Sequence, residues 1–142
     1  MAPIVSTIDI ARPPAEVFAY VTDPARFPEW QRDVVRVDVA GDGRFTTIRR
    51  FARAERTTTQ VVSSNDPPRS WSARGVDGPI RPSASVTVAP AEGGSRVTFA
   101  LDFEAHGLGV ALLPLVRRQA RLGAPVSYRN LKRLLEGSRQ AD

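Results

Sequence analysis

The sequence has no cysteine, and His106 is its only histidine among 142 residues. Without cysteine the chain cannot form disulfides, thiolate nucleophiles, zinc–thiolate sites or iron–sulfur clusters. A single histidine excludes any site that needs two, and a Ser–His–Asp relay would have to use His106. We therefore expect no bound metal and no cofactor, and these residue types identify no catalytic group.

Long hydrophobic segments are missing as well. The longest apolar run, residues 110–116, includes Pro114 and is far too short to span a membrane. The N-terminus shows no basic region followed by an apolar stretch, so we expect no secretory signal. These features predict a cytoplasmic protein without a transmembrane segment. The length predicts one domain over residues 1–142, large enough to bury a core without a metal or a disulfide.

The charge is unevenly distributed along the chain. The net charge is +5, and residues 107–142 carry all of it, because they contain seven basic and only two acidic residues. This basic segment meets the electrostatic criterion for nucleic-acid binding, but no nucleic-acid motif or phosphate-binding loop accompanies it. We therefore expect no nucleic-acid partner. Attraction to an anionic membrane surface, or a homodimer or acidic carrier-protein contact through the C-terminal helix, stays open.

Hydrophobic periodicity predicts the order of the elements. Residues 4–10 alternate as a strand, and two short helices follow over residues 15–21 and from Pro24 to near Trp30. About six strands are expected between residues 34 and 105, the clearest of them at 96–105. A long, kinked but continuous helix is expected over residues 108–135. This order is typical of an α+β domain with helices on one face of an antiparallel sheet.

Three segments resemble a known family. Residues 8–30, IDIARPPAEVFAYVTDPARFPEW, resemble the opening of polyketide cyclase/dehydrase-type proteins, which belong to the START-like, or SRPBCC, superfamily. Residues 94–99 resemble the start of the family's last strand, and residues 131–136 resemble the end of its C-terminal helix. The resemblance implies a helix-grip fold, in which a curved seven-stranded antiparallel sheet surrounds a long C-terminal helix. It also implies a ligand cavity between the sheet and that helix.

The inner face of the long helix fits such a cavity. Its ends carry large apolar residues, which are Leu113, Val116, Leu131, Leu134 and Leu135. Its middle carries Ala120, Ala124 and Ser127, which either leave room for a small-molecule pocket or let the sheet approach closely. The candidate ligand-binding residues are Phe27, Trp30, Phe51, Trp71, Arg81, Phe99, Leu113, Val116, Ala120, Ala124 and Tyr128.

Each candidate also has a purely structural interpretation. The aromatic residues are either pocket walls or ordinary core, and the Tyr128 hydroxyl either enters the pocket or reaches the surface. Among the strand arginines, Arg49, Arg53 and Arg81, we favour Arg81 as the contact to a ligand carboxylate or enolate. The alternative is a solvated residue on the convex face of the sheet. His106 is expected to be a surface or capping residue, and Asp102 to be solvated.

The sequence thus predicts a protein that binds a hydrophobic or polycyclic small molecule, polyketide-like or lipid-like, between the sheet and the C-terminal helix. The alternative is a polyketide cyclase, aromatase or dehydratase that acts on a ligand held in the same cavity. Such an enzyme can work largely by holding a reactive chain in a productive shape, so the lack of a catalytic motif weighs little against it.

Overall fold

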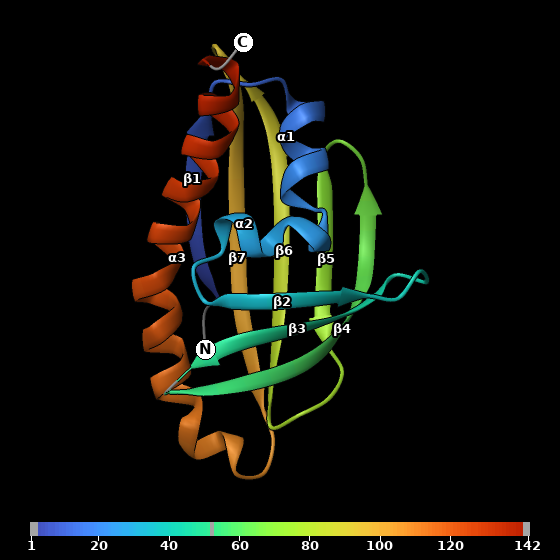
Figure 1. Ribbon diagram of the computed structural model, residues 1–142, viewed down its shortest axis with the longest axis vertical. Coiled ribbons are helices and arrows are strands. Elements are labelled where there is room, and N and C mark those ends of the chain that lie inside the picture. Colours follow the sequence, from blue (N-terminus) through green and yellow to red (C-terminus); the bar gives the residue numbers. More distant parts are fainter. Residues whose placement is uncertain (1–2, 52, 141–142) are drawn as a thin grey trace.

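The computed structural model describes residues 3–51 and 53–140, with side chains up to residue 137. A strand, β1 (Ile4–Ile10), is followed by α1 (Pro14–Val21), a short 3-10 helix (Pro24–Arg26) and α2 (Phe27–Trp30). Six strands and one long helix complete the chain (Figure 1). These are β2 (Val34–Val39), β3 (Arg44–Phe51), β4 (Ala54–Asp66), β5 (Ser70–Gly75), β6 (Ile80–Ala91), β7 (Gly94–Ala105) and α3 (Gly109–Gln140).

The seven strands form one antiparallel sheet in the order β1-β7-β6-β5-β4-β3-β2. The sheet is strongly curved, so that β2 and β3 cross in front of β6 and β7, and α1, α2 and α3 lie on its concave side (Figure 1). The long helix α3 packs mainly against β1, β7 and α2. This is the helix-grip arrangement, and the predicted fold class is confirmed.

Prolines and a capping side chain set the short helices. Pro14 occupies the first position of α1, where its missing N–H costs no helical hydrogen bond. Asp23 caps the 3-10 helix, because its carboxylate accepts a hydrogen bond of 3.1 Å from the N–H of Ala25. The turn then directs α2 so that Phe27 and Trp30 point into the core, with 6% and 4% of their surface exposed.

The helix α3 is continuous through two internal prolines, as the sequence predicts. Pro114 and Pro125 both lie on its exposed side, where water can replace the lost backbone hydrogen bonds. The helix also continues beyond the predicted end at Leu135, as far as Gln140. Leu134, expected on the inner face, is 41% exposed instead, whereas Leu131 and Leu135 are buried. No helix among the described residues is long and apolar enough to cross a membrane.

The central strands supply the floor of the core by simple alternation. Val86, Val88, Val97 and Phe99 are buried on the concave face, and their neighbours in β6 and β7 face outward. The spacing of Phe45, Ile48 and Phe51 in the sequence suggests a bulge, but the β3–β4 pairing runs without a shift from Arg44 to Phe51. The register instead shifts in β2, between Val34 and Arg36. Alternation within β3 therefore holds, which decides the orientation of its arginines.

Candidate functional site

Six aromatic rings form a continuous cluster between the sheet and α3, which we call the aromatic cluster. Its members come from α2, β3, β5, β7 and α3 and are Phe27, Trp30, Phe45, Trp71, Phe99 and Tyr128. Five of them are residues that the sequence singles out, and Phe45 is an addition. The structure therefore brings together residues that are up to a hundred positions apart in the chain.

The contacts within the aromatic cluster differ in geometry. Phe99 and Tyr128 stack almost in parallel, with ring centres 3.9 Å apart and an angle of 9° between their planes. Phe27 instead makes edge contacts to Trp30 and Trp71, at 6.0 and 6.3 Å. Both arrangements are favourable for aromatic rings, and each is worth on the order of 1 kcal/mol beyond burial. The tight stack attaches the middle of α3 to β7.

Two hydrogen-bond donors of the aromatic cluster are the indole N–H of Trp30 and the hydroxyl of Tyr128. The indole nitrogen of Trp30 is fully buried, and no hydrogen-bond partner is found for it among the described residues. Burial raises the pKa of Tyr128 to about 12, although the positive charge of Arg49 works in the opposite direction. Tyr128 therefore keeps its proton at neutral pH. A ligand carbonyl or enolate oxygen is the natural partner for such donors, because an unpaired buried N–H is costly.

Arg49 is a cation whose charge reaches the aromatic cluster. It follows Phe45 and Thr47 on the concave face of β3, and its charge acts on the Tyr128 hydroxyl. Its guanidinium donates hydrogen bonds to Asp33 Oδ1 at 2.9 Å and to Gln31 Oε1 at 2.8 Å. The side chain is 35% exposed, so the guanidinium is oriented but still accessible. This geometry suits a planar, anionic or strongly polar oxygen group.

A buried polar pair adjoins the aromatic cluster on β3 and β4. The Thr47 hydroxyl donates to Gln60 Oε1 at 2.6 Å, and only 1% of Thr47 and 5% of Gln60 is exposed. Phe45 is the residue paired with Gln60 across the two strands. Buried polar groups of this kind are stable only when hydrogen-bonded, and the short bond satisfies both oxygens. The pair adds further polar groups beside the aromatic cluster.

Arg81, the polar contact favoured from the sequence, lies elsewhere. In β6 it stands two residues before the exposed Ser83, so both side chains are on the same face of the strand. It also pairs with the exposed Glu104 of β7, so it belongs to the outer face of the sheet. Its Nε donates to the carbonyl oxygen of Gly78 at 3.2 Å. Arg53 lies in the exposed turn between β3 and β4, with a positive φ of 63°. Of the three candidate arginines, only Arg49 is directed toward the aromatic cluster.

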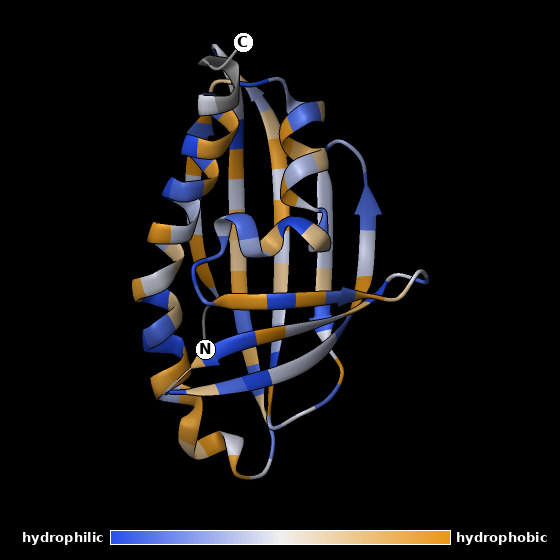
Figure 2. Ribbon diagram, viewed as in Figure 1, coloured by the Kyte–Doolittle hydropathy of each residue, from blue (hydrophilic) through white to orange (hydrophobic). Residues whose placement is uncertain are grey.

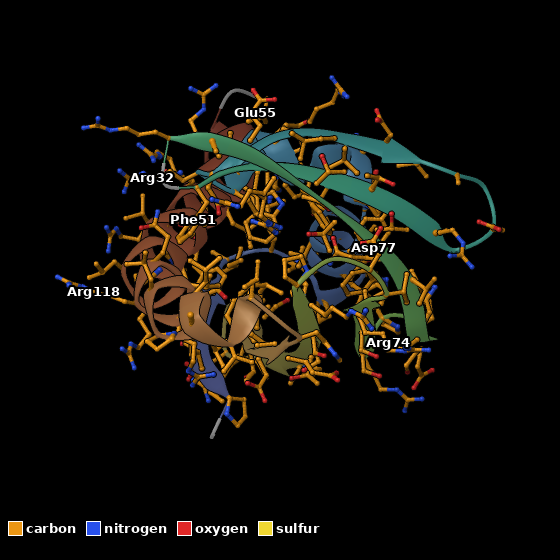
Figure 3. All side chains as sticks on the ribbon, turned by 90° about the horizontal axis from the view of Figure 1, so that it is seen from below. Arg32, Phe51, Glu55, Arg74, Asp77 and Arg118 are labelled. Carbon is orange, nitrogen blue, oxygen red and sulfur yellow. The ribbon has the colours of Figure 1, made fainter. Side chains whose placement is uncertain are left out.

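The remaining candidates lie on α3 and at the end of β3. Leu113, Val116, Ala120 and Ala124 are half-buried on the side of α3 that carries Tyr128. Phe51 ends β3 and is half-buried, with the guanidinium of Arg56 5.5 Å from its ring centre. Figures 1 and 3 agree that this end of β3 lies beside α3. Ser127 makes a close contact, because its hydroxyl accepts a 3.0 Å hydrogen bond from the N–H of Arg32.

Arg117 is a polar residue of this region that the sequence does not single out. It is the one buried arginine among the described residues, and its guanidinium lies 3.0 Å from Asp102 Oδ1. Asp102 was expected to be solvated; its side chain is 41% exposed and also accepts a hydrogen bond from the backbone N–H of Phe103. The helical spacing of Arg117 from Leu113 and Ala124 could have identified its inward orientation. His106 conforms to the expected surface role and pairs with Glu104 at 2.9 Å.

Two open hollows adjoin these elements. One, of about 380 Å³, lies between β1 and α3 and touches the exposed side of Tyr128. Its lining residues are Ser6, Thr7, Ile8, Pro125, Tyr128 and Arg129. The other, of about 360 Å³, is lined mainly by small residues of β5, β6 and β7. Neither hollow is lined by Ala120 or Ala124, so the cavity expected against these residues stays a prediction. No cluster of potential metal ligands is found among the described residues.

Comparison with known proteins adds a family and several structures. The family model described as "Polyketide cyclase / dehydrase and lipid transport" matches residues 1–136. The protein TTHA0849 from Thermus thermophilus has a similar structure, with a TM-score of 0.78 at 15% identity, over 96% of this chain and 98% of that one. No curated protein matches the sequence.

Two similar structures carry a functional description. The di-domain ARO/CYC BexL, from the BE-7585A biosynthetic pathway, matches with a TM-score of 0.75 at 20% identity. The di-domain ARO/CYC StfQ, from the steffimycin biosynthetic pathway, matches with a TM-score of 0.76 at 13% identity. The alignments cover 96% and 98% of this chain, but only 47% and 52% of those proteins. At such identities the likeness establishes a shared fold.

Proposed function

Because the chain belongs to the polyketide cyclase / dehydrase and lipid transport family, we propose that it binds a hydrophobic or polycyclic small molecule between the sheet and α3. The membership agrees with the resemblance drawn from the sequence. The likeness to two ARO/CYC proteins of biosynthetic pathways supports a polyketide-like ligand rather than a lipid. The ligand contacts we propose are Phe27, Trp30, Trp71, Phe99 and Tyr128, with Phe51, Leu113, Val116, Ala120 and Ala124 extending the site along α3.

The observation that carries this proposal is the aromatic cluster with its two donors. Rings on α2, β7 and α3 pack against one another, and a polycyclic ligand that enters between the sheet and α3 would add stacking contacts of the same kind. The unpaired N–H of Trp30 and the neutral hydroxyl of Tyr128 can both donate to ligand carbonyl oxygens. We propose Arg49, in place of Arg81, as the group that recognises a carboxylate or an enolate.

A second candidate function is cyclisation, aromatisation or dehydration of a polyketide-type substrate in the same site. It is favoured by Arg49, whose charge acts on the Tyr128 hydroxyl. The guanidinium can stabilise an enolate, and the neutral phenol of Tyr128 can donate a proton to it. In a binding protein the two groups only anchor the ligand. In an enzyme they act mainly on charge that develops in the transition state.

The two tryptophans make the binding test simple. Trp30 and Trp71 are the only tryptophans of the chain, and both belong to the aromatic cluster. We expect a hydroxyanthraquinone with a carboxylate substituent to quench their fluorescence in a saturable way. Replacement of Ala124 with Trp should abolish binding of an environment-sensitive apolar dye, read from the emission of the dye. Gln119→Trp is the matched control, because Gln119 lies on the exposed side of the same helix.

Substitution of Arg49 and of Arg81 tests which face of the sheet binds the ligand. Arg49→Gln should weaken binding of the carboxylate-bearing anthraquinone by about 1.5–3 kcal/mol, roughly tenfold to a hundredfold, and barely affect the neutral parent compound. Arg81→Gln removes the same charge from the outer face and should leave both affinities unchanged. Equal losses for both ligands, or for both variants, would contradict the role of Arg49. In an enzyme, Arg49→Gln should reduce turnover more than affinity.

A further inference from the structure

The outward side of α3 is unusual because it exposes large apolar residues. Leu115 and Leu122 are 51% and 63% exposed, and they stand two helical turns apart on the same line. At the start of the helix, Leu108 and Val110 are 87% and 61% exposed. Figure 2 shows hydrophobic and hydrophilic residues alternating along α3, with a hydrophobic stretch in its first turns. Single exposed leucines are ordinary, but an aligned series suggests a contact surface.

Arginines alternate with these leucines along the same line. Arg118 lies between Leu115 and Leu122, and Arg129 follows two turns after Leu122, opposite the buried Ser127 and Leu131. We call Leu115, Arg118, Leu122 and Arg129 the outer ridge. Figure 3 shows Arg118 pointing away from the body of the molecule. No ion pair of either arginine is found among the described residues, and the chain has no Asp or Glu between positions 107 and 135.

From this pattern we propose that the outer ridge docks on an anionic phospholipid bilayer, with α3 lying along its surface. Leucine side chains of a helix that lies in the membrane interface insert among the headgroups, while arginines extend toward lipid phosphates. The ridge offers both elements on one exposed helix face. This inference depends on the surface of α3 alone, so it holds whether or not the interior binds the proposed ligand.

Charge distinguishes a bilayer from the other occupants of this surface. A second copy packed through the same ridge would bring the arginines of both copies into one interface, and the acid-free stretch offers no carboxylate to compensate their charge. A nucleic acid would use the arginines but would leave Leu115 and Leu122 exposed to water or phosphate. A bilayer satisfies both kinds of residue and needs no matching shape. An anionic surface therefore fits the ridge better than either alternative.

The test is co-sedimentation of the whole protein with vesicles. We expect binding to vesicles made of phosphatidylcholine and phosphatidylglycerol in roughly equal parts, weak binding to phosphatidylcholine alone, and a loss of binding as salt is added. The variant Arg118→Gln/Arg129→Gln should bind about 30-fold more weakly, because each arginine near an anionic membrane contributes about fivefold. Leu115→Gln/Leu122→Gln should weaken binding by about tenfold or more, since half of each leucine is available for burial.

Matched variants elsewhere on the surface control for the loss of net charge and of exposed apolar area. Arg44→Gln/Arg74→Gln removes the same charge from exposed positions off the helix. Val5→Thr/Val39→Thr removes two valines that are each 58% exposed on strands. Both control variants should bind the anionic vesicles like the unmodified protein. Circular dichroism should show that all four variants keep the fold.

Three results would overturn the proposal. The first is failure of the unmodified protein to sediment with anionic vesicles, or an equal loss in the ridge and control variants. The second is a dimer in sedimentation velocity that the leucine variant dissociates, which would assign the ridge to a second copy. The third is unchanged vesicle binding in the ridge variants together with lost binding to a purified acidic carrier protein, which would assign the ridge to that class of partner.

Discussion

The stack of Tyr128 on Phe99 predicts a specific loss of stability at alkaline pH. Burial raises the pKa of Tyr128 to about 12 in the folded protein, against an ordinary value of 10.0. Between these values the unfolded chain has lost the phenolic proton and the folded chain still holds it. The unfolded state therefore binds fewer protons, and the free energy of unfolding falls as the pH rises. The contribution of Tyr128 is intact below about pH 10 and is lost as the pH approaches about 12.

The size of this effect follows from the shift. One pKa unit corresponds to about 1.36 kcal/mol, so the difference between about 12 and 10.0 should lower the free energy of unfolding by about 3 kcal/mol on account of Tyr128. Urea unfolding at a series of pH values measures it, and Tyr128→Phe should remove this part of the pH dependence. The chain has only two tyrosines, so the variant leaves Tyr20 as a single absorbance reporter of phenolate formation.

Tyr20→Phe is the control for that experiment. Burial and the hydrogen bond to Glu29 also raise the pKa of Tyr20, so Tyr20 makes a separate contribution to the alkaline loss of stability. Tyr20→Phe should remove that contribution and leave the contribution of Tyr128 unchanged. The reasoning would be refuted if Tyr128→Phe kept the alkaline slope of the unmodified protein. It would also be refuted if the remaining tyrosine of Tyr20→Phe ionised near pH 10 in the folded state.

Two further predictions concern stability. Gly94→Ala should cost at least about 2 kcal/mol in urea unfolding, because a Cβ there would lie 2.2 Å from the Ile10 carbonyl oxygen, whereas Gly41→Ala, with open space around it, should be nearly neutral. Arg117→Met should lower the free energy of unfolding by up to about 1 kcal/mol at neutral pH, because it removes the ion pair to Asp102, whose side chain is 41% exposed. Unchanged denaturation midpoints would contradict either argument.

The sequence predicts the elements of the fold well because their signals are local. Strict alternation of apolar residues over 97–103 defines β7, and prolines at 14 and 24 mark the starts of the short helices. Element ends are less well defined. The strand predicted over residues 96–105 begins at Gly94, and the helix predicted to end at Leu135 continues to Gln140. Those ends depend on pairing partners and on packing, which a local pattern does not contain.

The aromatic part of the candidate site was also accessible from the sequence. Large aromatic residues in a chain with few of them belong in the core, and Phe27, Trp30, Trp71 and Phe99 are buried there. Their mutual arrangement was not accessible, because the stack of Phe99 on Tyr128 joins two elements that meet only in the folded state. The polar residues were harder still, since Arg117 occupies an inward position that helical spacing assigns to any residue type.

The arginines show why strand pairing decides which charged groups face a site. Arg81 was favoured as a strand arginine in contact with the ligand, but in β6 its pairing with the exposed Glu104 places it on the outer face of the sheet. Arg49 was left undecided because Ile48 interrupts the alternation of apolar residues. The β3–β4 register has no shift there, so Arg49 follows Phe45 and Thr47 onto the concave face. Register is a property of two strands together, and it determines here which face of the sheet carries the Arg49 side chain.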